Sequence, residues 1–294
     1  ATNLALLTDE MLQFFQEHDI YISTSLDGPR ELHNANRPRP GGDSYERTID
    51  GIKRCRAWLG EDSVSALMTT TRRSLEMPEA IIDEYVTQGF NSLFLRWLSP
   101  FGFATKTDRA LGYPVAEWHA FYERGLRHIL SLNESGTAFR EDFASIILRK
   151  MMTPYAASYV DLQSPSGLGV SVVAYNYDGE VYASDEARML AETGDRTFRL
   201  GNVHEDSFET LFCSDRLVDL LMETITECIP GCADCAFEPY CGTDPVLHHA
   251  IQGDAVGHRP TSVFCSRNMF VFKLLISLRE SNSGISRILD RWAY

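Results

Sequence analysis

Four cysteines near the end of the chain constrain its fold more than any other feature. Three of them are spaced as Cys232-x2-Cys235-x5-Cys241, and Cys265 follows farther along. A Cys-x2-Cys pair can bind one metal centre from a tight turn, and two more thiolates from nearby loops complete a four-sulfur shell. Tetrahedral thiolate coordination suits both zinc and iron-sulfur clusters, so the spacing alone leaves both open. The density of cysteines argues against the alternative of scattered buried thiols.

Composition and charge exclude several classes of function. Lys and Arg number 27 against 41 Asp and Glu, and the net charge of -14 repels nucleic acid and anionic lipid. The apolar run from Met269 to Leu278 contains Lys273 and is shorter than the roughly 20 residues that cross a bilayer. No basic leader with a cleavage site opens the sequence. We therefore expect a cytoplasmic protein without membrane segments, in which clustered cysteines bind metal rather than form disulfides.

The N-terminal part alternates helical and strand patterns. Helices are predicted over Thr8–His18, Ser44–Leu59 and Pro78–Gly89, and strands over Ile20–Leu26, Val64–Thr70 and Ser92–Leu98, with a strand stub at Ala1–Asn3. In the first helix Thr8 is the predicted N-cap, and the predicted inward residues are Met11, Leu12, Phe14 and Phe15. Asp43 and Glu46 have the spacing of a capping box. Strands separated by helices imply βα units and a parallel sheet.

The second half mixes helices with a hairpin. Helices are predicted near 118–132, 141–152, 208–226 and 268–278, and strands at Val170–Tyr175 and Glu180–Ala183, joined through Asp178-Gly179. This change of pattern predicts a second domain.

The cysteine region resembles the SPASM domain of radical S-adenosylmethionine (radical SAM) enzymes. The run from Cys232 to Asp244 reads Cys-Ala-Asp-Cys-Ala-Phe-Glu-Pro-Tyr-Cys-Gly-Thr-Asp, whereas the family pattern is Cys-x2-Cys-x5-Cys-x3-Cys with one further distant Cys. The resemblance implies that Cys232, Cys235, Cys241 and Cys265 bind an outer auxiliary [4Fe-4S] cluster.

The ligands of the family's inner auxiliary cluster are missing together. Asp244 stands at the x3 cysteine position, and Ser184 stands at the cysteine of the Gly-x4-Cys segment that here begins at Gly179. We therefore expect one auxiliary cluster. Cys228-x3-Cys232-x2-Cys235 has the spacing of the radical SAM motif itself, but it follows a helical stretch and shares two cysteines with the SPASM pattern. Cys228 is therefore interpreted as a bystander or a spare ligand.

The N-terminal half carries the family's barrel motifs in order. They are Thr2-Asn3, Ser25-Leu26-Asp27-Gly28-Pro29, His33-Asn34 with Arg37, and Gly42-Asp43-Ser44-Tyr45. The resemblance to anaerobic sulfatase-maturating enzymes implies that Ser25 and Arg37 contact the polar parts of S-adenosylmethionine (SAM), that Leu98 contacts its adenosine, and that Asp185 is the catalytic acid-base group. Ser25 also stands at the carboxyl end of a predicted parallel strand, where α/β barrels place their chemistry.

These resemblances imply an α/β chain with a partial (β/α)6 radical SAM barrel, followed by a SPASM-type α+β auxiliary iron-sulfur domain. The barrel and linking helices are assigned to residues 1–160, and the auxiliary domain with a C-terminal helix to residues 161–294. The radical SAM cysteine motif and the Gly-Gly-Glu-Pro segment would lie before Ala1, so we expect a fragment that does not cleave SAM as it stands.

The implied full-length protein is a peptide-modifying maturase. It would use SAM, a second [4Fe-4S] cluster and a 5'-deoxyadenosyl radical, with a peptide or protein substrate and ferredoxin or flavodoxin as electron donor. The Asp244-Pro245-Val246 segment is also similar to that of the His-Xaa-Ser system maturases. Two alternatives stay open: a noncatalytic iron-sulfur protein that transfers electrons or binds a peptide on a degenerate barrel, and a structural zinc site at the same cysteines.

Overall fold

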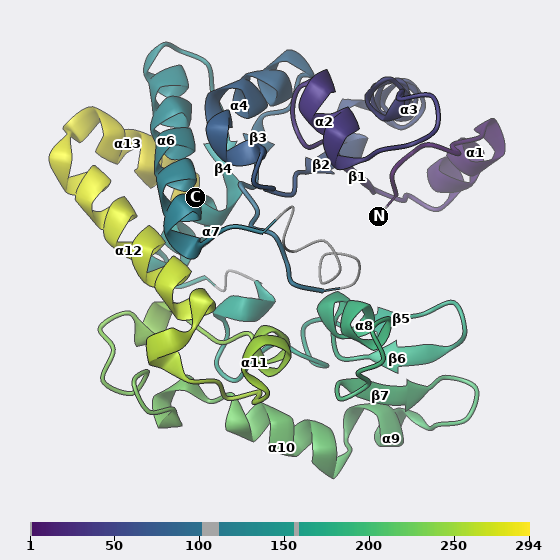
Figure 1. The fold of residues 1–294 in the computed structure, drawn as a ribbon, viewed down its shortest axis with the longest axis vertical. Helices are drawn as coiled ribbons and strands as arrows, with labels where there is room; N and C mark the ends of the chain where they lie inside the picture. The colour runs from purple at the N-terminus through teal and green to yellow at the C-terminus, as the bar shows by residue number, and fades with distance from the viewer. Residues whose placement is uncertain (1, 102–111, 156–158) are drawn as a thin grey trace. The chain divides into compact units, whose positions relative to one another are not determined.

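The computed structural model describes residues 2–101, 112–155 and 159–294 (Figure 1). The chain forms two compact units: Ala1–Leu98 with Leu111–Phe143 make up the first, and Ser99–Ala110 with Ala144–Tyr294 make up the second. The domain boundary predicted after residue 160 stays a prediction. Within the described ranges, no helix combines the length and the apolar character needed to cross a membrane.

The first unit consists of βα units, as predicted. Its elements are α1 (Asp9–Glu17), β1 (Ile22–Ser25), α2 (Arg30–Asn36), α3 (Ser44–Leu59), β2 (Val64–Leu67), α4 (Pro78–Thr87), β3 (Ser92–Leu93), α6 (Val115–Glu134) and β4 (Arg140–Glu141), with 3-10 turns at Glu61–Ser63 and Ser74–Glu76. Strand β1 pairs in parallel with β2, and β3 with β4. The strands described form two-stranded pairs and no closed barrel. The prediction of a parallel α/β fold is therefore confirmed.

The predicted strand stub at residues 1–3 is only partly described, because Ala1 lies outside the described ranges. The backbone N–H of Thr2 donates to the carbonyl of Ser23 at 2.9 Å, so the chain runs beside β1 here. Thr8 caps α1 as predicted, its hydroxyl accepting from the N–H of Met11. The buried face predicted for this helix is wrong, because α1 packs against α3 and only Leu12 is buried, while Phe14 is 51% exposed.

The capping box predicted at the start of α3 is also wrong. Asp43 occupies the N-cap position, but its side chain makes no capping hydrogen bond and pairs with Arg39 and Arg47 instead. The side-chain oxygen of Asn34 takes that role and accepts from the N–H of Tyr45 at 2.8 Å. A residue of α2 therefore satisfies a free donor of α3, which also connects the two helices.

Helix α4 follows the sequence pattern closely. Pro78 is its first residue, and the sequence pattern predicts an inward face of Ile81, Ile82, Tyr85 and Val86, of which the first three are fully buried and Val86 is half-buried. Gly89, which the pattern predicts as the stop, has a φ of 76°. Only glycine adopts this left-handed conformation without steric cost, so the helix ends there.

The second unit combines helices with a small antiparallel sheet. Its elements are α7 (Asp142–Met152), β5 (Ala174–Tyr175), β6 (Glu180–Tyr182), α8 (Asp185–Ala191), β7 (Arg199–Asn202), α9 (Phe208–Phe212), α10 (Asp215–Glu223), α11 (Pro245–Gln252), α12 (Val263–Ser281) and α13 (Ser283–Ala293), with 3-10 turns at Val160–Leu162, Thr226–Cys228, Glu238–Tyr240 and Arg259–Thr261. Strands β5, β6 and β7 pair antiparallel in that order, which confirms the predicted hairpin.

Two helix predictions in this unit need correction. The single helix predicted near 208–226 is two helices, because Ser214 caps α10 by accepting from the N–H of Leu217 and so starts a new helix. The last predicted helix, near 268–278, is longer than predicted, since α12 begins at Val263, five residues earlier, where Ser262 caps it. Helix α13 then follows, capped by Asn282.

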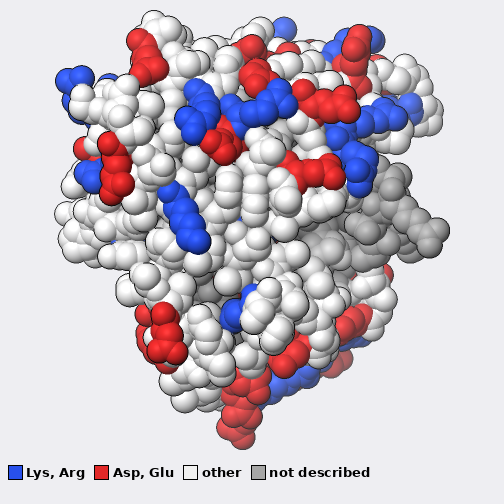
Figure 2. Space-filling view, turned by 60° about the vertical axis from the view of Figure 1, so that its left-hand side comes forward, with Lys and Arg blue, Asp and Glu red and all other residues white. Residues whose placement is uncertain are grey.

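Charged side chains of both signs are interspersed on the face shown in Figure 2. Exposed ion pairs occur in the first unit, for example Arg124 with Glu79 at 2.8 Å and Arg127 with Glu123 at 2.7 Å. Exposed pairs of this kind contribute little to stability. On this face the basic residues do not form the continuous patch that is typical of nucleic-acid binding.

Candidate metal centre

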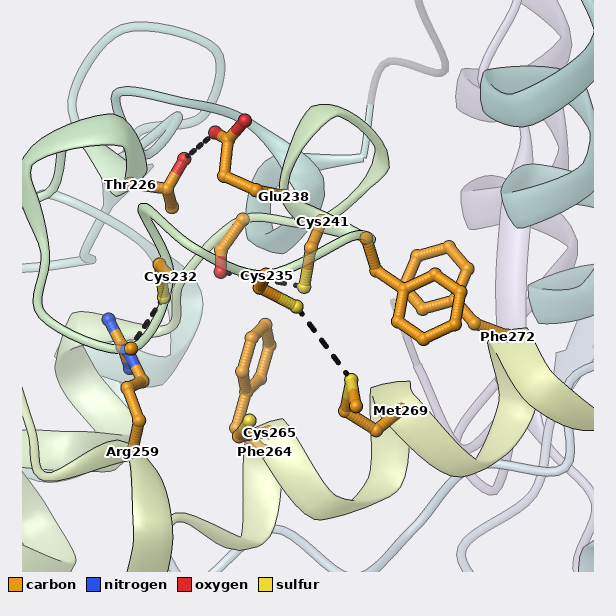
Figure 3. Close-up of a pocket in the computed structure, with 13 residues that line it drawn as sticks. Thr226, Cys232, Cys235, Glu238, Cys241, Arg259, Phe264, Cys265, Met269 and Phe272 are labelled. Carbon is orange, nitrogen blue, oxygen red and sulfur yellow. Dashed lines mark hydrogen bonds between the residues drawn. The ribbon is translucent and has the colours of Figure 1, made fainter.

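The four cysteines of the motif line one cavity in the second unit (Figure 3). Cys232 and Cys235 lie in a tight turn, in which the N–H of Cys235 donates to the carbonyl of Cys232 at 2.8 Å. Cys241 follows the 3-10 turn Glu238–Tyr240, and Cys265 lies in the first turn of α12. All four are free thiols, so three loop positions and one helix position bring four possible metal ligands together.

Apolar side chains form much of the remaining wall. Phe237 stacks on Phe272 with ring centroids 5.0 Å apart, and Phe264 also lines the cavity (Figure 3). The thioether sulfur of Met269 lies 3.9 Å from the Sγ of Cys235. Together with the cysteines, these residues line a cavity that is partly open to solvent. Such a lining limits water access and lowers the local dielectric constant, which suits a redox-active centre.

The four thiols are chemically able to hold two kinds of metal centre, a single zinc ion or an iron-sulfur cluster. A single zinc ion with bonds of about 2.3 Å requires its sulfur ligands to lie within about 4 Å of one another. In the described ranges, no group of three or more His, Cys, Asp or Glu side chains is close enough to hold one ion. A polynuclear cluster occupies the middle of its site and keeps its thiolates farther apart. The four thiols around a common space supply the donor set of such a cluster.

Two N–H groups donate to the sulfur atoms. The Nε of Arg259 lies 3.2 Å from the Sγ of Cys232, and the Nδ2 of Asn268 lies 3.6 Å from the Sγ of Cys241. Burial raises the pKa of the Cys241 and Cys265 thiols, and the hydrogen bond from Asn268 partly offsets this at Cys241. These two thiols are therefore protonated near pH 7, and a metal that binds to them displaces their protons.

Arg259 belongs to a buried polar network behind the cavity. Its Nη2 donates to the hydroxyl of Thr243 at 3.0 Å, and its Nη1 lies 3.2 Å from Nδ1 and 3.0 Å from Nε2 of His248. The Nε2 of His248 also lies 2.8 Å from the Oγ of Ser262, which accepts from the N–H of Cys265 at 3.1 Å. Burial, helped by the charge of Arg259, lowers the pKa of His248 to about 4. The imidazole is therefore neutral near pH 7.

Close packing fixes the backbone around Cys241. A Cβ at Gly242 would lie 2.4 Å from the carbonyl oxygen of Asp161, so only glycine fits this position. The ammonium of Lys150 donates to the carbonyl of Leu162 and, at 2.9 Å, to the carbonyl of Cys241. Burial lowers the pKa of Lys150, and the nearby Cys241, Glu238 and Glu227 partly offset this.

Sequence reasoning did not identify Arg259, His248, Asn268 or Lys150. A signal existed for Asn268, which lies three residues after Cys265 and therefore on the same helix face. No spacing rule connects Arg259, His248 or Lys150 to the cysteines, since only the tertiary fold brings them together. Cys228 is exposed and is not among the residues that line the cavity.

The two positions where the family pattern has inner-cluster cysteines both cap helices. Ser184 is 1% exposed and starts α8, its hydroxyl accepting from the N–H of Ala187 at 3.1 Å. Asp244 is 7% exposed and starts α11, its carboxylate accepting from the N–H of Leu247 at 2.9 Å. Both substituted residues therefore have a structural role in this chain.

The residues predicted to bind SAM all lie in the first unit. Ser25 is half-buried at the end of β1, and the backbone N–H of Leu98 donates to the hydroxyl of Tyr113 at 2.9 Å. Arg37 forms a two-pronged ion pair with Asp27, at 2.8 and 3.1 Å, and the Asp27 side chain is only 1% exposed. The charge of Arg37 is therefore already balanced by a buried carboxylate.

Asp185, the predicted catalytic residue, is the first residue of α8 in the second unit. Its side chain is 62% exposed and pairs with Arg188 at 2.9 Å. An exposed acid in the first turn also stabilises a helix through the helix dipole. Its catalytic role stays a prediction.

No protein-family model matches the chain. Among curated proteins, an uncharacterized protein of Synechocystis sp. is 23% identical over 292 residues, which is 97% of this chain and 70% of that protein. An uncharacterized protein of Methanothermobacter thermautotrophicus is 40% identical over 91 residues, which cover 31% of this chain and 32% of that protein. A serine-type anaerobic sulfatase-maturating enzyme of Bacteroides thetaiotaomicron is 40% identical over 52 residues, 17% of this chain and 13% of that enzyme.

Solved structures match over nearly the whole chain. Native anSMEcpe with bound AdoMet, an anaerobic sulfatase-maturating enzyme, superimposes with a TM-score of 0.77 at 15% identity, covering 99% of this chain and 74% of that one. The same protein with AdoMet and the Kp18Cys peptide gives a TM-score of 0.72 over 99% of this chain and 75% of that one. The resemblance predicted from the motifs is thus confirmed at the level of the fold: over nearly its whole length the chain is folded like an anaerobic sulfatase-maturating enzyme of the radical SAM/SPASM type.

Proposed function

We propose that the chain is the larger part of a radical SAM/SPASM maturase that modifies a peptide or protein. The observation that carries this proposal is the convergence of four thiols on one cavity in a chain with the fold of a sulfatase-maturating enzyme. The chain spans about three quarters of the length of the solved relatives, so the activity is proposed for the full-length protein. The partial (β/α)6 barrel and the SPASM-type domain are proposed with it.

One auxiliary [4Fe-4S] cluster is proposed at Cys232, Cys235, Cys241 and Cys265. Two features of the cavity support it: the common space between the thiols and the N–H groups aimed at two of the sulfurs. Ser184 and Asp244 support a single auxiliary cluster, because both are engaged as helix caps and neither supplies a thiolate.

The barrel residues are proposed to bind SAM. When bound, SAM and the radical SAM cluster supply a 5'-deoxyadenosyl radical that takes a hydrogen atom from the substrate. Ser25 offers a hydroxyl at the end of β1, and Leu98 an apolar side chain after β3. Because Arg37 is paired with Asp27, we assign it the task of orienting the loop after β1 as well as contacting SAM. Asp185 is the proposed proton acceptor, since its exposed carboxylate is accessible to a substrate.

The test uses the full-length protein, expressed and purified without oxygen. With SAM, a reductant and candidate peptides, we expect 5'-deoxyadenosine to form, and we expect about four irons in addition to those of the radical SAM cluster. A Cys232→Ala/Cys235→Ala variant should lose those four irons only, and Cys228→Ser is its matched control. Failure to form 5'-deoxyadenosine in a fully iron-loaded protein would exclude the enzyme proposal.

A noncatalytic iron-sulfur protein is the second candidate. The conversion of two inner-cluster positions into helix caps favours it, as does the pairing of Asp185 with Arg188. This candidate predicts bound iron and a reversible one-electron couple, or peptide binding, without 5'-deoxyadenosine. A colourless protein with stoichiometric zinc would instead support a structural zinc site.

A further inference from the structure

Arg259 is a buried cation whose hydrogen-bonding partners carry no formal negative charge. It is 7% exposed. Among the residues that the structure describes, its guanidinium contacts the sulfur of Cys232, the ring of His248 and the hydroxyl of Thr243. A buried charge is costly unless an opposite charge compensates it. The nearest group that can become an anion is the thiol of Cys232, which is a thiolate whenever it holds a metal.

The network behind Arg259 holds its guanidinium in one orientation. Thr243 accepts from Nη2, and His248 accepts from Nη1. Since the imidazole is neutral, one of its ring nitrogens can accept from Nη1, which lies 3.2 Å from Nδ1 and 3.0 Å from Nε2, and Nε2 also lies 2.8 Å from the Oγ of Ser262. Each N–H of a guanidinium points in a direction fixed by its plane, so these contacts also fix the Nε–H that points at Cys232.

A fixed positive charge and a hydrogen bond to a ligand sulfur both act on redox chemistry. Reduction adds one electron to a cluster and makes it and its thiolates more negative. Hydrogen bonds to the sulfurs and nearby net charge are among the factors that set the potential of such a cluster. A cation held at 3.2 Å from one sulfur stabilises the reduced state more than the oxidised state.

We infer that Arg259 is a positioning residue that raises the reduction potential of the auxiliary centre, by holding its charge and its Nε–H against the sulfur of Cys232. This inference rests on the proposed function, because it requires a redox-active cluster at the four cysteines. His248, Thr243 and Ser262 act through Arg259, by keeping its guanidinium in place.

The experiment compares full-length protein with Arg259→Gln, Arg259→Lys and, as a matched control, Arg279→Gln. Arg279 is partly exposed on α12 and pairs with Asp290, so its loss changes the net charge equally without contact to the cavity. Iron per chain is measured first. Each protein is then titrated electrochemically with EPR detection of the reduced auxiliary cluster, in a background that lacks the radical SAM cysteines.

We expect Arg259→Gln to keep the auxiliary irons and to shift the ratio of oxidised to reduced cluster at least tenfold toward the oxidised form at a given potential, which is a fall of about 59 mV for one electron. Arg259→Lys keeps the positive charge but lacks the planar guanidinium whose N–H groups contact Cys232, His248 and Thr243. Its reduction potential should therefore fall by a smaller amount. The control should match the wild type.

Wild-type potentials in iron-loaded Arg259→Gln and Arg259→Lys would overturn the inference while leaving the proposed function intact. If Arg259→Gln does not retain iron, the potential of Arg259→Lys decides in the same way. If the wild-type protein holds no iron at the four cysteines, the proposed function itself has failed. The two failures are therefore distinguishable.

Discussion

A substitution at Asp244, one of the two positions where the SPASM pattern has an inner-cluster cysteine, tests how much its buried charge costs the folded state. The carboxyl group caps α11 but is almost completely buried, and burial raises its pKa from the ordinary 3.8 to about 6. Holding this group ionised above pH 6 therefore costs the folded state roughly 3 kcal/mol at most. Asn caps helices as well as Asp and carries no charge. We expect Asp244→Asn to increase the free energy of unfolding by about 1 to 3 kcal/mol near pH 8.

The sign of the pH dependence follows from the direction of the pKa change. An acid with a raised pKa in the folded state destabilises that state above about pH 6, and the penalty disappears as the pH falls toward 3.8. The advantage of Asp244→Asn should therefore shrink on acidification. His248, with its pKa lowered to about 4, acts in the opposite direction: as the pH falls from 6.5 to about 4, the unfolded state takes up a proton that the folded state does not, so the folded state becomes less stable. Asp244→Asn leaves the effect of His248 unopposed, so its stability should fall more steeply with acid than that of the wild type.

The assay is urea unfolding followed by circular dichroism, without oxygen and at matched iron content, at several values between about pH 5 and pH 8. Asp244→Ala loses the cap and should be about 1 kcal/mol less stable than Asp244→Asn at every pH. Asp219→Asn, at an exposed position of α10, controls for the change in net charge. The reasoning is refuted if Asp244→Asn is no more stable than the wild type near pH 8.

Three further outcomes are expected. Cys241→Ala or Cys265→Ala should abolish binding of the auxiliary iron, whereas Cys213→Ser, at an exposed position, should not, as iron analysis after anaerobic reconstitution would reveal. Gly242→Ala should lower the free energy of unfolding by about 2 kcal/mol or more, because the new Cβ meets backbone atoms 2.4 and 2.6 Å away, whereas Gly253→Ala, with open space around it and a φ of 75°, should lower it by about 1 kcal/mol. Arg37→Met should cost about 3 kcal/mol in urea unfolding, because it leaves the buried Asp27 carboxylate unpaired, and Asp27→Asn combined with Arg37→Met should recover part of that loss.

Local patterns in the sequence predicted the elements whose formation depends on nearby residues. The apolar periodicity and the stop at Gly89 were sufficient to predict the position of α4, since one face of that helix is buried along its length. The capping box at Asp43 was not predictable in this way, because two arginines compete for its carboxylate and Asn34 supplies the cap from another helix. The break before α10 was missed because the apolar pattern continues across Ser214.

In the candidate site, the cysteines were predictable from the sequence and the polar groups around them were not. Spacing and family resemblance singled out the four cysteines, and the structure places all four around one cavity, while their role as cluster ligands stays a prediction. The surrounding polar groups were not predictable, since Arg259 and His248 reach the cavity only through the packing of separate loops and helices. For Asp185 and Arg37, the motifs identified the residues but did not predict that each side chain forms an ion pair, Asp185 with Arg188 and Arg37 with Asp27.

The caps at Ser184 and Asp244 also affect how the second unit can assemble. In each case a side-chain oxygen accepts a hydrogen bond from a backbone N–H in the first turn of the helix. The first turns of α8 and α11 are therefore capped without a metal. In the proposed iron-sulfur protein, these first turns would therefore form without iron and would survive its loss. Iron binding would then organise only the loops around Cys232, Cys235 and Cys241 and the start of α12.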